Sequence, residues 1–177
     1  MGTKIKKLIA RMFGRYFLEY RRTIKGVCIN DREEILLIQK LKRGNEVGRW
    51  ELPGGKRDKG DRSDKSALKR ELAEELGKKI LMFVRKCKKL ESVRTDANKY
   101  TNYSHHFFQV ILHSSFSLNS ITISREHMNV AWFSWEELQK MRKTGWLTKS
   151  TLFYLNAVRK EREFIAKKMR ISYEQIA

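Results

Sequence analysis

The sequence predicts an α/β domain in which strands alternate with helices and a central helix packs on a sheet. Short runs rich in β-branched and aromatic residues alternate with stretches of helical periodicity. The chain has 177 residues, close to one ordinary domain, and 41% of them are hydrophobic, which is enough for one core. One proline and ten glycines argue against a long flexible linker. We therefore expect one compact domain with helical extensions.

The N-terminal segment 3–22 is typical of a basic amphipathic helix. Its apolar residues recur at helical spacing, Lys and Arg occupy much of the remainder, and Glu19 is its only acid. We accordingly treat 1–22 as an N-terminal helix and 23–177 as the main domain. The pattern leaves several roles open: packing on the domain, a homodimer contact, contact with a membrane surface, or organelle targeting.

Two strands and a helix are expected next. The strand-like runs 23–29 and 34–39 flank polar residues that predict a hairpin. A helix is expected from about Ser63 to Leu76. It ends at Gly77, because glycine adopts positive φ at little cost.

Further strands are predicted at 79–86, 105–113 and 129–133. His105 and His106 are neighbours within one of them. Successive side chains of a strand face opposite sides, so these histidines are not expected to form a metal pair.

Two helices complete the prediction. Ser134 and Glu137 have the spacing of a capping box, which begins a short helix that reaches about Met141. A C-terminal helix is expected at about 150–169, and its Lys and Arg residues are interpreted as its solvated face.

The charge pattern indicates both a partner class and a site. The formal net charge is +19, from 39 Lys and Arg against 20 Asp and Glu. Such an excess attracts phosphate-rich partners, namely nucleotides, RNA or anionic lipid, unless it serves solubility alone. Against this trend, acids gather between Asp58 and Glu75. Crowded carboxylates repel one another unless cations neutralise them, so this segment predicts a metal site.

The cysteines and the hydropathy bear on location. Cys28 and Cys87 lie far apart, with no CxxC pair, which favours a reducing cytoplasm. We find no apolar run long enough to cross a bilayer and no signal-peptide pattern, so a cytoplasmic protein is expected.

Three carboxylates share one face of the central helix. At 100° per residue, Glu74 lies about 60° to one side of Glu71, and Glu75 lies about 40° to the other. The preceding Gly54 and Gly55 allow a tight turn of positive φ, so that a backbone carbonyl can point at a metal beside the helix. Hard divalent cations prefer such oxygen ligands.

This loop and helix resemble the Nudix box, whose pattern is Gly, five residues, Glu, seven residues, and Arg-Glu-apolar-x-Glu-Glu-x-Gly-apolar. The signature covers 54–78, and its core here is Arg70-Glu71-Leu72-Ala73-Glu74-Glu75-Leu76-Gly77. The preceding run 48–55 is similar to that of MutT-type members. The resemblance implies a Nudix-type α/β/α sandwich with a mixed sheet.

The signature departs from the family pattern at three places. Asp61 stands where Glu is usual, and eight residues rather than seven separate it from Arg70. The loop therefore carries one extra residue before the helix. Lys78 occupies the final apolar position.

The resemblance implies a hydrolase that cleaves the phosphoanhydride bond of a nucleoside diphosphate linked to another group, such as a nucleoside triphosphate or ADP-ribose. It implies one to three Mg²⁺ or Mn²⁺ ions that activate the attacking water. The implied ligands are Glu71, Glu74, Glu75 and the carbonyl of Gly54.

The resemblance also assigns the remaining roles. Arg70 orients Glu71, and the general base is either Glu71 or Glu126, the latter being a loop acid six residues before Trp132. The supporting residues are Gly55, Asp61 and Gly77. Independently of the resemblance, Trp50 is expected either to stack on a substrate base or to pack in the core.

Two other readings remain open. An RNA 5′ end, triphosphorylated or capped, is the alternative substrate that the charge suggests. A Nudix-derived module that senses a nucleotide without cutting it is the non-catalytic alternative, although it would not need the full carboxylate set.

Overall fold

The computed structural model describes residues 19–41, 48–98 and 101–158. Within these residues the strands are β1 Glu19–Ile29, β2 Ile35–Lys40, β3 Trp50–Glu51, β4 Val84–Asn98, β5 Thr101–Leu112 and β6 His127–Phe133. The helices are α2 Asp64–Leu76 and α3 Trp135–Thr144, with 3₁₀ turns η2 Lys78–Phe83 and η3 Leu118–Ser120; residues 149–158 are also helical.

The strands form one mixed sheet in the order β3-β2-β1-β5-β4, with β6 also paired to β2. β1 runs parallel to β5, whereas the other strand pairs are antiparallel. The predicted hairpin is confirmed, because Ile29 at the end of β1 pairs with Ile35 at the start of β2. The mixed sheet that the Nudix resemblance implied is therefore present.

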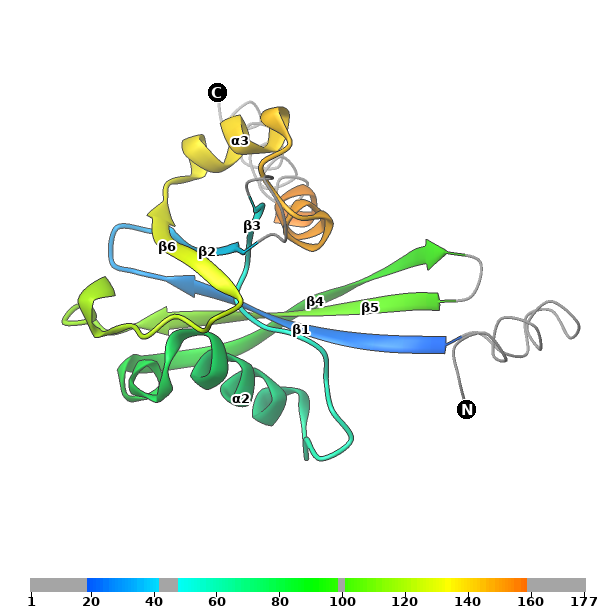
Figure 1. Ribbon diagram of the computed structural model, residues 1–177, viewed down its shortest axis with the longest axis horizontal. Coiled ribbons are helices and arrows are strands. Elements are labelled where there is room, and N and C mark those ends of the chain that lie inside the picture. The colour runs from blue at the N-terminus through cyan, green and yellow to red at the C-terminus, as the bar shows by residue number, and fades with distance from the viewer. Residues whose placement is uncertain (1–18, 42–47, 99–100, 159–177) are drawn as a thin grey trace, which may run out of the picture.

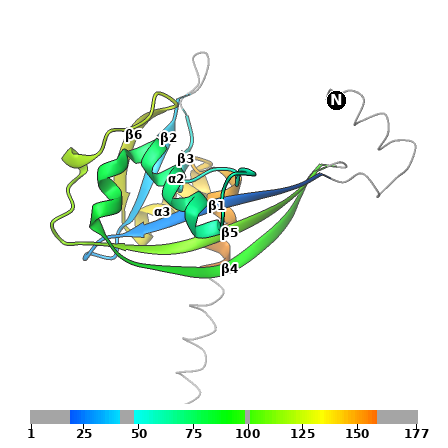
Figure 2. The same ribbon diagram turned by 90° about the horizontal axis from the view of Figure 1, so that it is seen from below.

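Helices cover the two faces of this sheet (Figures 1 and 2). α2 lies on one face, where its buried residues Leu68, Leu72 and Leu76 pack with Ile24 and Phe108 in one core cluster. A second cluster on the other face joins the sheet to Leu138 of α3 and to Tyr154 and Leu155 of the helical segment 149–158. These three layers are the expected α/β/α sandwich.

Two predicted elements differ in the structure. The predicted helix 3–22 is wrong for residues 19–22, which belong to β1. Residues 3–18 of that predicted helix lie outside the described residues. Residues 78–83 form the turn η2, not part of a strand, because Gly77 takes a φ of 86° and the amide of Ile80 bonds back to its carbonyl. The strand that follows, β4, extends to Asn98.

The other predicted elements are close to their observed bounds. Ser63 caps α2, which ends at Gly77 as expected. The Ser134–Glu137 capping box begins α3, which continues three residues past the predicted Met141 to Thr144. The predicted helix 150–169 is helical up to residue 158, and its remainder lies outside the described part of the chain.

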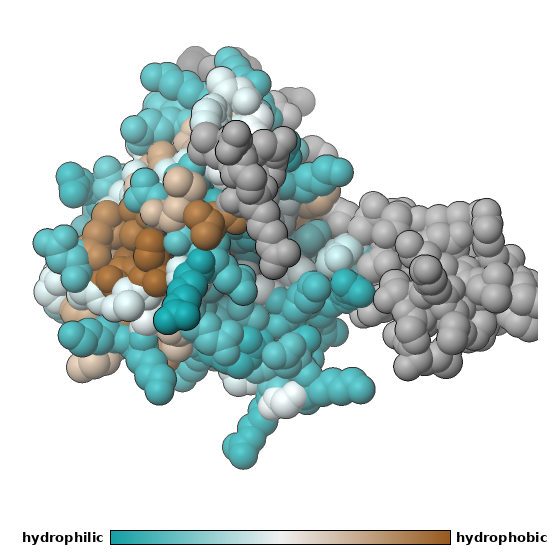
Figure 3. Space-filling view, viewed as in Figure 1, coloured by the Kyte–Doolittle hydropathy of each residue, from teal (hydrophilic) through white to brown (hydrophobic). Residues whose placement is uncertain are grey.

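The face of the molecule shown in Figure 3 is mainly hydrophilic. In the face shown in Figure 3, hydrophobic residues gather at the left end of the sheet and hydrophilic ones cover most of the rest. Among the described helices, none combines the length and the apolar content needed to cross a membrane.

Candidate metal centre

The orientation of α2 decides which carboxylates turn inward. Ser63 accepts a hydrogen bond from the Ser66 amide, and the Ser66 hydroxyl accepts one from the Ser63 amide, so the helix begins at a defined residue. The apolar stripe of Leu68 and Leu72 then packs against the sheet. Glu71 lies beside that stripe on the helix surface and is itself buried.

The loop before α2 lies directly against strand β1. The Ile24 amide donates to the Gly55 carbonyl at 2.8 Å, and the Gly26 amide donates to the Pro53 carbonyl at the same distance. Gly54 between them has a φ of 123°, a conformation that L side chains rarely adopt. The positive-φ turn predicted at Gly54 is confirmed.

Gly55 and Glu71 lie so close together that a side chain at position 55 would force the Glu71 carboxylate to shift. A Cβ atom on Gly55 would lie 2.4 Å from Glu71 Oε2 and 2.6 Å from Oε1. The carboxylate is thus held against the loop backbone, with the side chain 11% exposed. Burial raises the pKa of Glu71, Arg70 opposes this effect, and the negative charges of Glu75 and Glu74 add to it.

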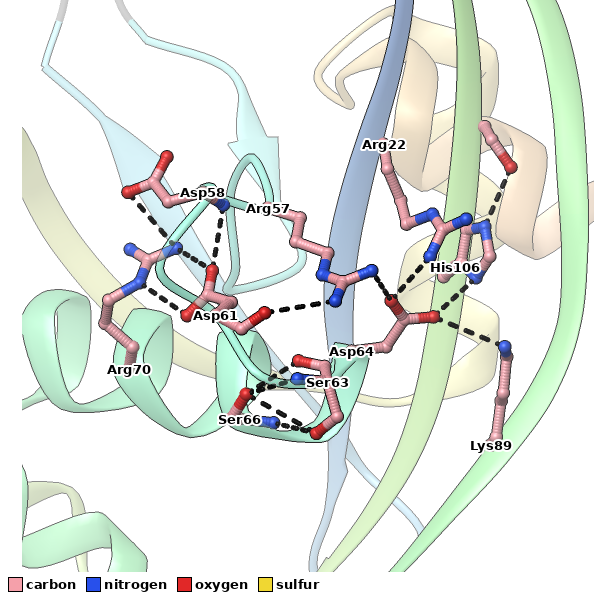
Figure 4. Close-up of polar contacts among 11 residues, drawn as sticks. Arg22, Arg57, Asp58, Asp61, Ser63, Asp64, Ser66, Arg70, Lys89 and His106 are labelled. Carbon is pink, nitrogen blue, oxygen red and sulfur yellow. Dashed lines mark hydrogen bonds and ion pairs between the residues drawn. The ribbon is translucent and has the colours of Figure 1, made fainter.

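Arg70 connects the helix to the loop (Figure 4). Its guanidinium donates to Asp61 Oδ1 at 3.2 Å and to Asp61 Oδ2 at 3.0 Å, and it lies 2.9 Å from Glu71 Oε1. It also donates to Glu74 Oε2 at 3.0 Å and to the Lys56 carbonyl at 3.0 Å. Arg70 is therefore placed to orient Glu71, as the resemblance implied.

The loop accommodates its extra residue without moving Asp61 away from Arg70. The Asp58 amide donates to Asp61 Oδ2 at 2.8 Å, which closes a short turn within the loop. The hydrogen bond from Arg70, together with that amide, lowers the pKa of Asp61. Despite the unusual spacing, Asp61 remains a charged partner that holds the Arg70 guanidinium.

Glu75 points from α2 towards the backbone of the loop. Its Oε2 accepts a hydrogen bond from the Gly54 amide at 2.5 Å. Burial raises the pKa of Glu75, although the charge of Lys25 and this amide bond act in the opposite direction. Glu75 is therefore a partly desolvated acid whose ionised form would gain from a nearby cation.

Two residues beside Glu75 were not predicted as site residues. Ligand atoms of Glu51 on β3, Glu75 on α2 and His127 on β6 lie within 4.8 Å of one another. His127 Nε2 is buried, has no hydrogen-bond partner among the described residues, and lies 3.8 Å from Glu75 Oε1. Since β6 pairs with β2, and β2 with β3, strand pairing brings His127 close to Glu51.

Lys25 already supplies one positive charge to this cluster. Its ammonium lies 3.4 Å from Glu51 Oε2, donates to the Leu52 carbonyl at 2.9 Å, and also donates to the carbonyl of Gly54. Burial alone would raise the pKa of Glu51, but Lys25, His127 and Lys40 lower it to about 2. The Gly54 carbonyl therefore accepts a hydrogen bond from Lys25, and the metal contact expected of it stays a prediction.

The remaining predicted residues lie at the edge of the site or away from it. The Glu74 side chain is 58% exposed and held by Arg70. Glu126 is exposed and immediately precedes the buried His127, and its carbonyl accepts from the Leu41 amide at 2.8 Å. Trp50 packs edge-on against Phe133, with ring centroids 4.8 Å apart, in the core cluster on the face opposite α2. That packing favours the core role of Trp50.

His105 and His106 do face opposite sides of β5, as predicted. His105 Nδ1 lies 2.7 Å from the Thr23 hydroxyl, and its ring lies 5.5 Å from that of Phe153. His106 Nδ1 instead lies 3.0 Å from Asp64 on α2 (Figure 4). They do not form a pair.

The donor set fits a hard divalent cation. Glu75 and Glu51 supply carboxylate oxygens beside His127, Lys25 links the Gly54 carbonyl to Glu51, and Glu71 lies one turn before Glu75 on α2. The unpartnered Nε2 of His127 adds a nitrogen that Mn²⁺ accepts more readily than Mg²⁺ does. A bound cation would also offset the repulsion that raises the pKa of Glu71.

A comparison with family models agrees with this geometry. Residues 19–154 match the model of the NUDIX domain. The chain belongs to the Nudix family. The match covers the described strands, α2 and α3, so the box residues lie within the matched Nudix domain.

Relatives of this Nudix domain include a Mycobacterium tuberculosis protein that carries the name "Putative 8-oxo-dGTP diphosphatase 2". It is 48% identical over 46 residues, which is 26% of this chain and 32% of the relative. The matched segment thus spans about a third of that relative's length.

Solved structures share the fold over most of the chain. MutT protein from Methanosarcina mazei Go1 has a TM-score of 0.63 at 22% identity, covering 82% of this chain and 96% of that one. The NUDIX domain of Shewanella oneidensis NrtR, complexed with ADP ribose, has a TM-score of 0.62 at 18% identity, covering 91% and 99%. At these identities the likeness shows the fold alone.

Proposed function

We propose that this Nudix protein is a divalent-metal-dependent hydrolase that cleaves the phosphoanhydride bond of a nucleoside diphosphate linked to another moiety. The observation that carries the proposal is the inward placement of Glu71 and Glu75 against the loop backbone. Burying two carboxylates close together is unfavourable, and binding of a divalent cation is the function that best accounts for it.

The proposed roles combine the Nudix resemblance with the contacts of these residues. Glu71, Glu74 and Glu75, with the Gly54 carbonyl, would hold Mg²⁺ or Mn²⁺. The bound cation would supply neutralisation of the phosphate oxygens and a more acidic water. Glu51 and His127 adjoin the same cluster and are further candidate ligands.

Glu71 is our proposed general base, and Glu126 is the alternative. The Glu71 carboxylate would accept a proton from a water molecule as the oxygen of that water bonds to phosphorus. The bridging P–O bond would break, and its electrons would leave with the departing phosphate group. Arg70, fixed by Asp61, would keep that carboxylate oriented. Gly77 ends α2 and stands at the position of the glycine in the Nudix box.

A substrate panel tests the proposal. It includes nucleoside triphosphates, an 8-oxo-purine triphosphate, ADP-ribose, dinucleoside polyphosphates, and triphosphorylated and capped RNA, each with Mg²⁺ or Mn²⁺ and with products identified. We expect turnover of at least one substrate, loss of turnover with a chelator, and a fall of about 10²- to 10⁴-fold in Glu71→Gln.

The control variant is Glu136→Gln, which neutralises an exposed acid on α3. It should retain full activity. Unchanged turnover in a folded Glu71→Gln/Glu75→Gln double variant would remove the proposed mechanism. Metal-independent binding of a nucleotide without any turnover would instead support the sensing module.

RNA with a 5′-triphosphate or cap is the second candidate substrate, supported by the net charge of +19. Binding a single nucleoside triphosphate needs far less positive charge than the +19 of this chain. The panel separates the two candidates by comparing the same 5′ end on an RNA and on a single nucleoside.

A further inference from the structure

A groove lies between α2 and the edge strand β4, on a different side of α2 from Glu74. Its volume is about 270 Å³. On the helix, Lys65 and Lys69 line it, and they lie roughly 120° and 160° around the axis from Glu71 at 100° per residue. The groove is therefore separate from the carboxylate cluster (Figure 2 shows α2 lying across the strands).

The groove combines an apolar floor with a cationic rim. Leu68, Leu72 and Val110 contribute to the floor. The rim carries four exposed cations, namely Lys65, Lys69, Arg85 and Lys86. No Asp or Glu is among the lining residues, and none of these four cations forms an ion pair with another described residue.

The nearest acid on α2 does not compensate this charge. Asp64 already lies 3.0 Å from Arg22, 3.5 Å from Arg57 and 3.3 Å from Lys89, and His106 is also within 3.0 Å (Figure 4). Asp64 therefore belongs to a cluster with its own surplus of positive charge. The rim of the groove is left without a counter-charge within the described residues.

We propose that this groove binds a small anionic molecule that carries one aromatic ring, of the class of an aryl phosphate ester. The groove has about the volume that nine water molecules occupy in liquid water. This space suits one ring and its anionic group rather than a peptide segment or a lipid chain. The floor would bury the ring, and the rim would meet the phosphate, with the planar guanidinium of Arg85 able to bind two of its oxygens.

Cys87 provides a reporter inside the groove. Its thiol lines the groove and is partly exposed, whereas Cys28, the other cysteine, is fully buried. Lys65 and Lys69 line the same groove as this thiol; burial raises the pKa of Cys87, and the two lysines oppose that effect. A ligand seated in the groove would cover Cys87.

The test measures how fast an uncharged reagent, methyl methanethiosulfonate, modifies Cys87 in the full chain without divalent metal. Phenyl phosphate should slow the reaction strongly, whereas inorganic phosphate and benzyl alcohol, which each lack one half of the ligand, should slow it little. Cys87→Ser should remove the reactive thiol. In the variant Lys65→Gln/Lys69→Gln, about tenfold more phenyl phosphate should be needed for the same protection of Cys87, because two ion pairs with the phosphate are lost.

The matched control is Lys140→Gln/Lys143→Gln, which removes the same charge from exposed positions of α3. This variant should retain the protection seen in the unmodified chain. No slowing by phenyl phosphate, equal slowing by inorganic phosphate, or undiminished protection in Lys65→Gln/Lys69→Gln would each overturn the proposal. The readout needs neither metal nor turnover, so its result is independent of the proposed hydrolase function.

Discussion

At Gly55 the loop backbone passes so close to Glu71 that any side chain would collide with the carboxylate. Gly55→Ala should therefore push Glu71 out of place, lower stability by about 1–3 kcal/mol, and reduce Mn²⁺ affinity. Denaturant unfolding and metal titration measure both effects. Gly60→Ala in the same loop is the control, because a Cβ there meets nothing within 4 Å. Equal behaviour of the two variants would contradict the contact.

Glu51 is a second residue whose environment makes a measurable prediction. Its pKa lies at about 2 in the folded chain, against an ordinary value of 4.5. The ionised form is thus favoured by folding, so its contribution is fully present above about pH 4.5 and is lost as the pH falls towards 2. Removing the charge would leave Lys25 with one buried partner fewer.

We expect Glu51→Gln to lower the free energy of unfolding by about 3 kcal/mol at pH 7. The difference from the unmodified chain should shrink as the pH is lowered from 5 towards 3, because only the unmodified chain loses its carboxylate. Urea unfolding at several pH values measures this. A difference that stays constant with pH would exclude the proposed role of the Glu51 charge.

At the scale of elements, α2 matters because it carries the carboxylates as one rigid unit. Ser63 defines where it begins. Ser63→Ala should cost about 1 kcal/mol, whereas Ser63→Gly should cost only a few tenths, since glycine is a tolerated N-cap. Thermal unfolding of both variants tests this. Equal losses would mean that the cap bond is not what stabilises the first turn.

Most helices and the hairpin were predictable because they depend on local pattern. The four-residue spacing of Leu68, Leu72 and Leu76 predicted the buried face of α2, and the capping box of Ser134 and Glu137 predicted where α3 begins. Of the predicted strand 79–86, residues 79–83 are wrong and 84–86 are the start of β4. Its apolar run resembles a strand, but Gly77 turns the chain and Met82 is 84% exposed.

At the scale of the whole molecule, the charge of +19 makes a prediction about substrate. If the substrate is the 5′ end of an RNA, its binding should weaken steeply as salt increases, because phosphate contacts release counterions. Turnover of the same triphosphate on a single nucleoside should change much less. A salt series with both substrates measures the two slopes. Equal slopes would show that the surface charge does not engage an RNA chain.

The sequence alone was enough for those features of this protein that arise within a few residues of one another. Helical periodicity placed Glu71 and Glu75 side by side, and the glycine turn beside them followed from conformational preference. Strand alternation likewise separated His105 from His106.

Tertiary structure decided which groups surround those carboxylates. Lys25, Glu51 and His127 come from three strands, and only the pairing of those strands and the packing of α2 bring them to Glu75. The groove beside β4 also exists only because α2 lies against a strand that follows it in the chain. Contacts of this kind depend on sheet register and layer packing, which no local spacing encodes.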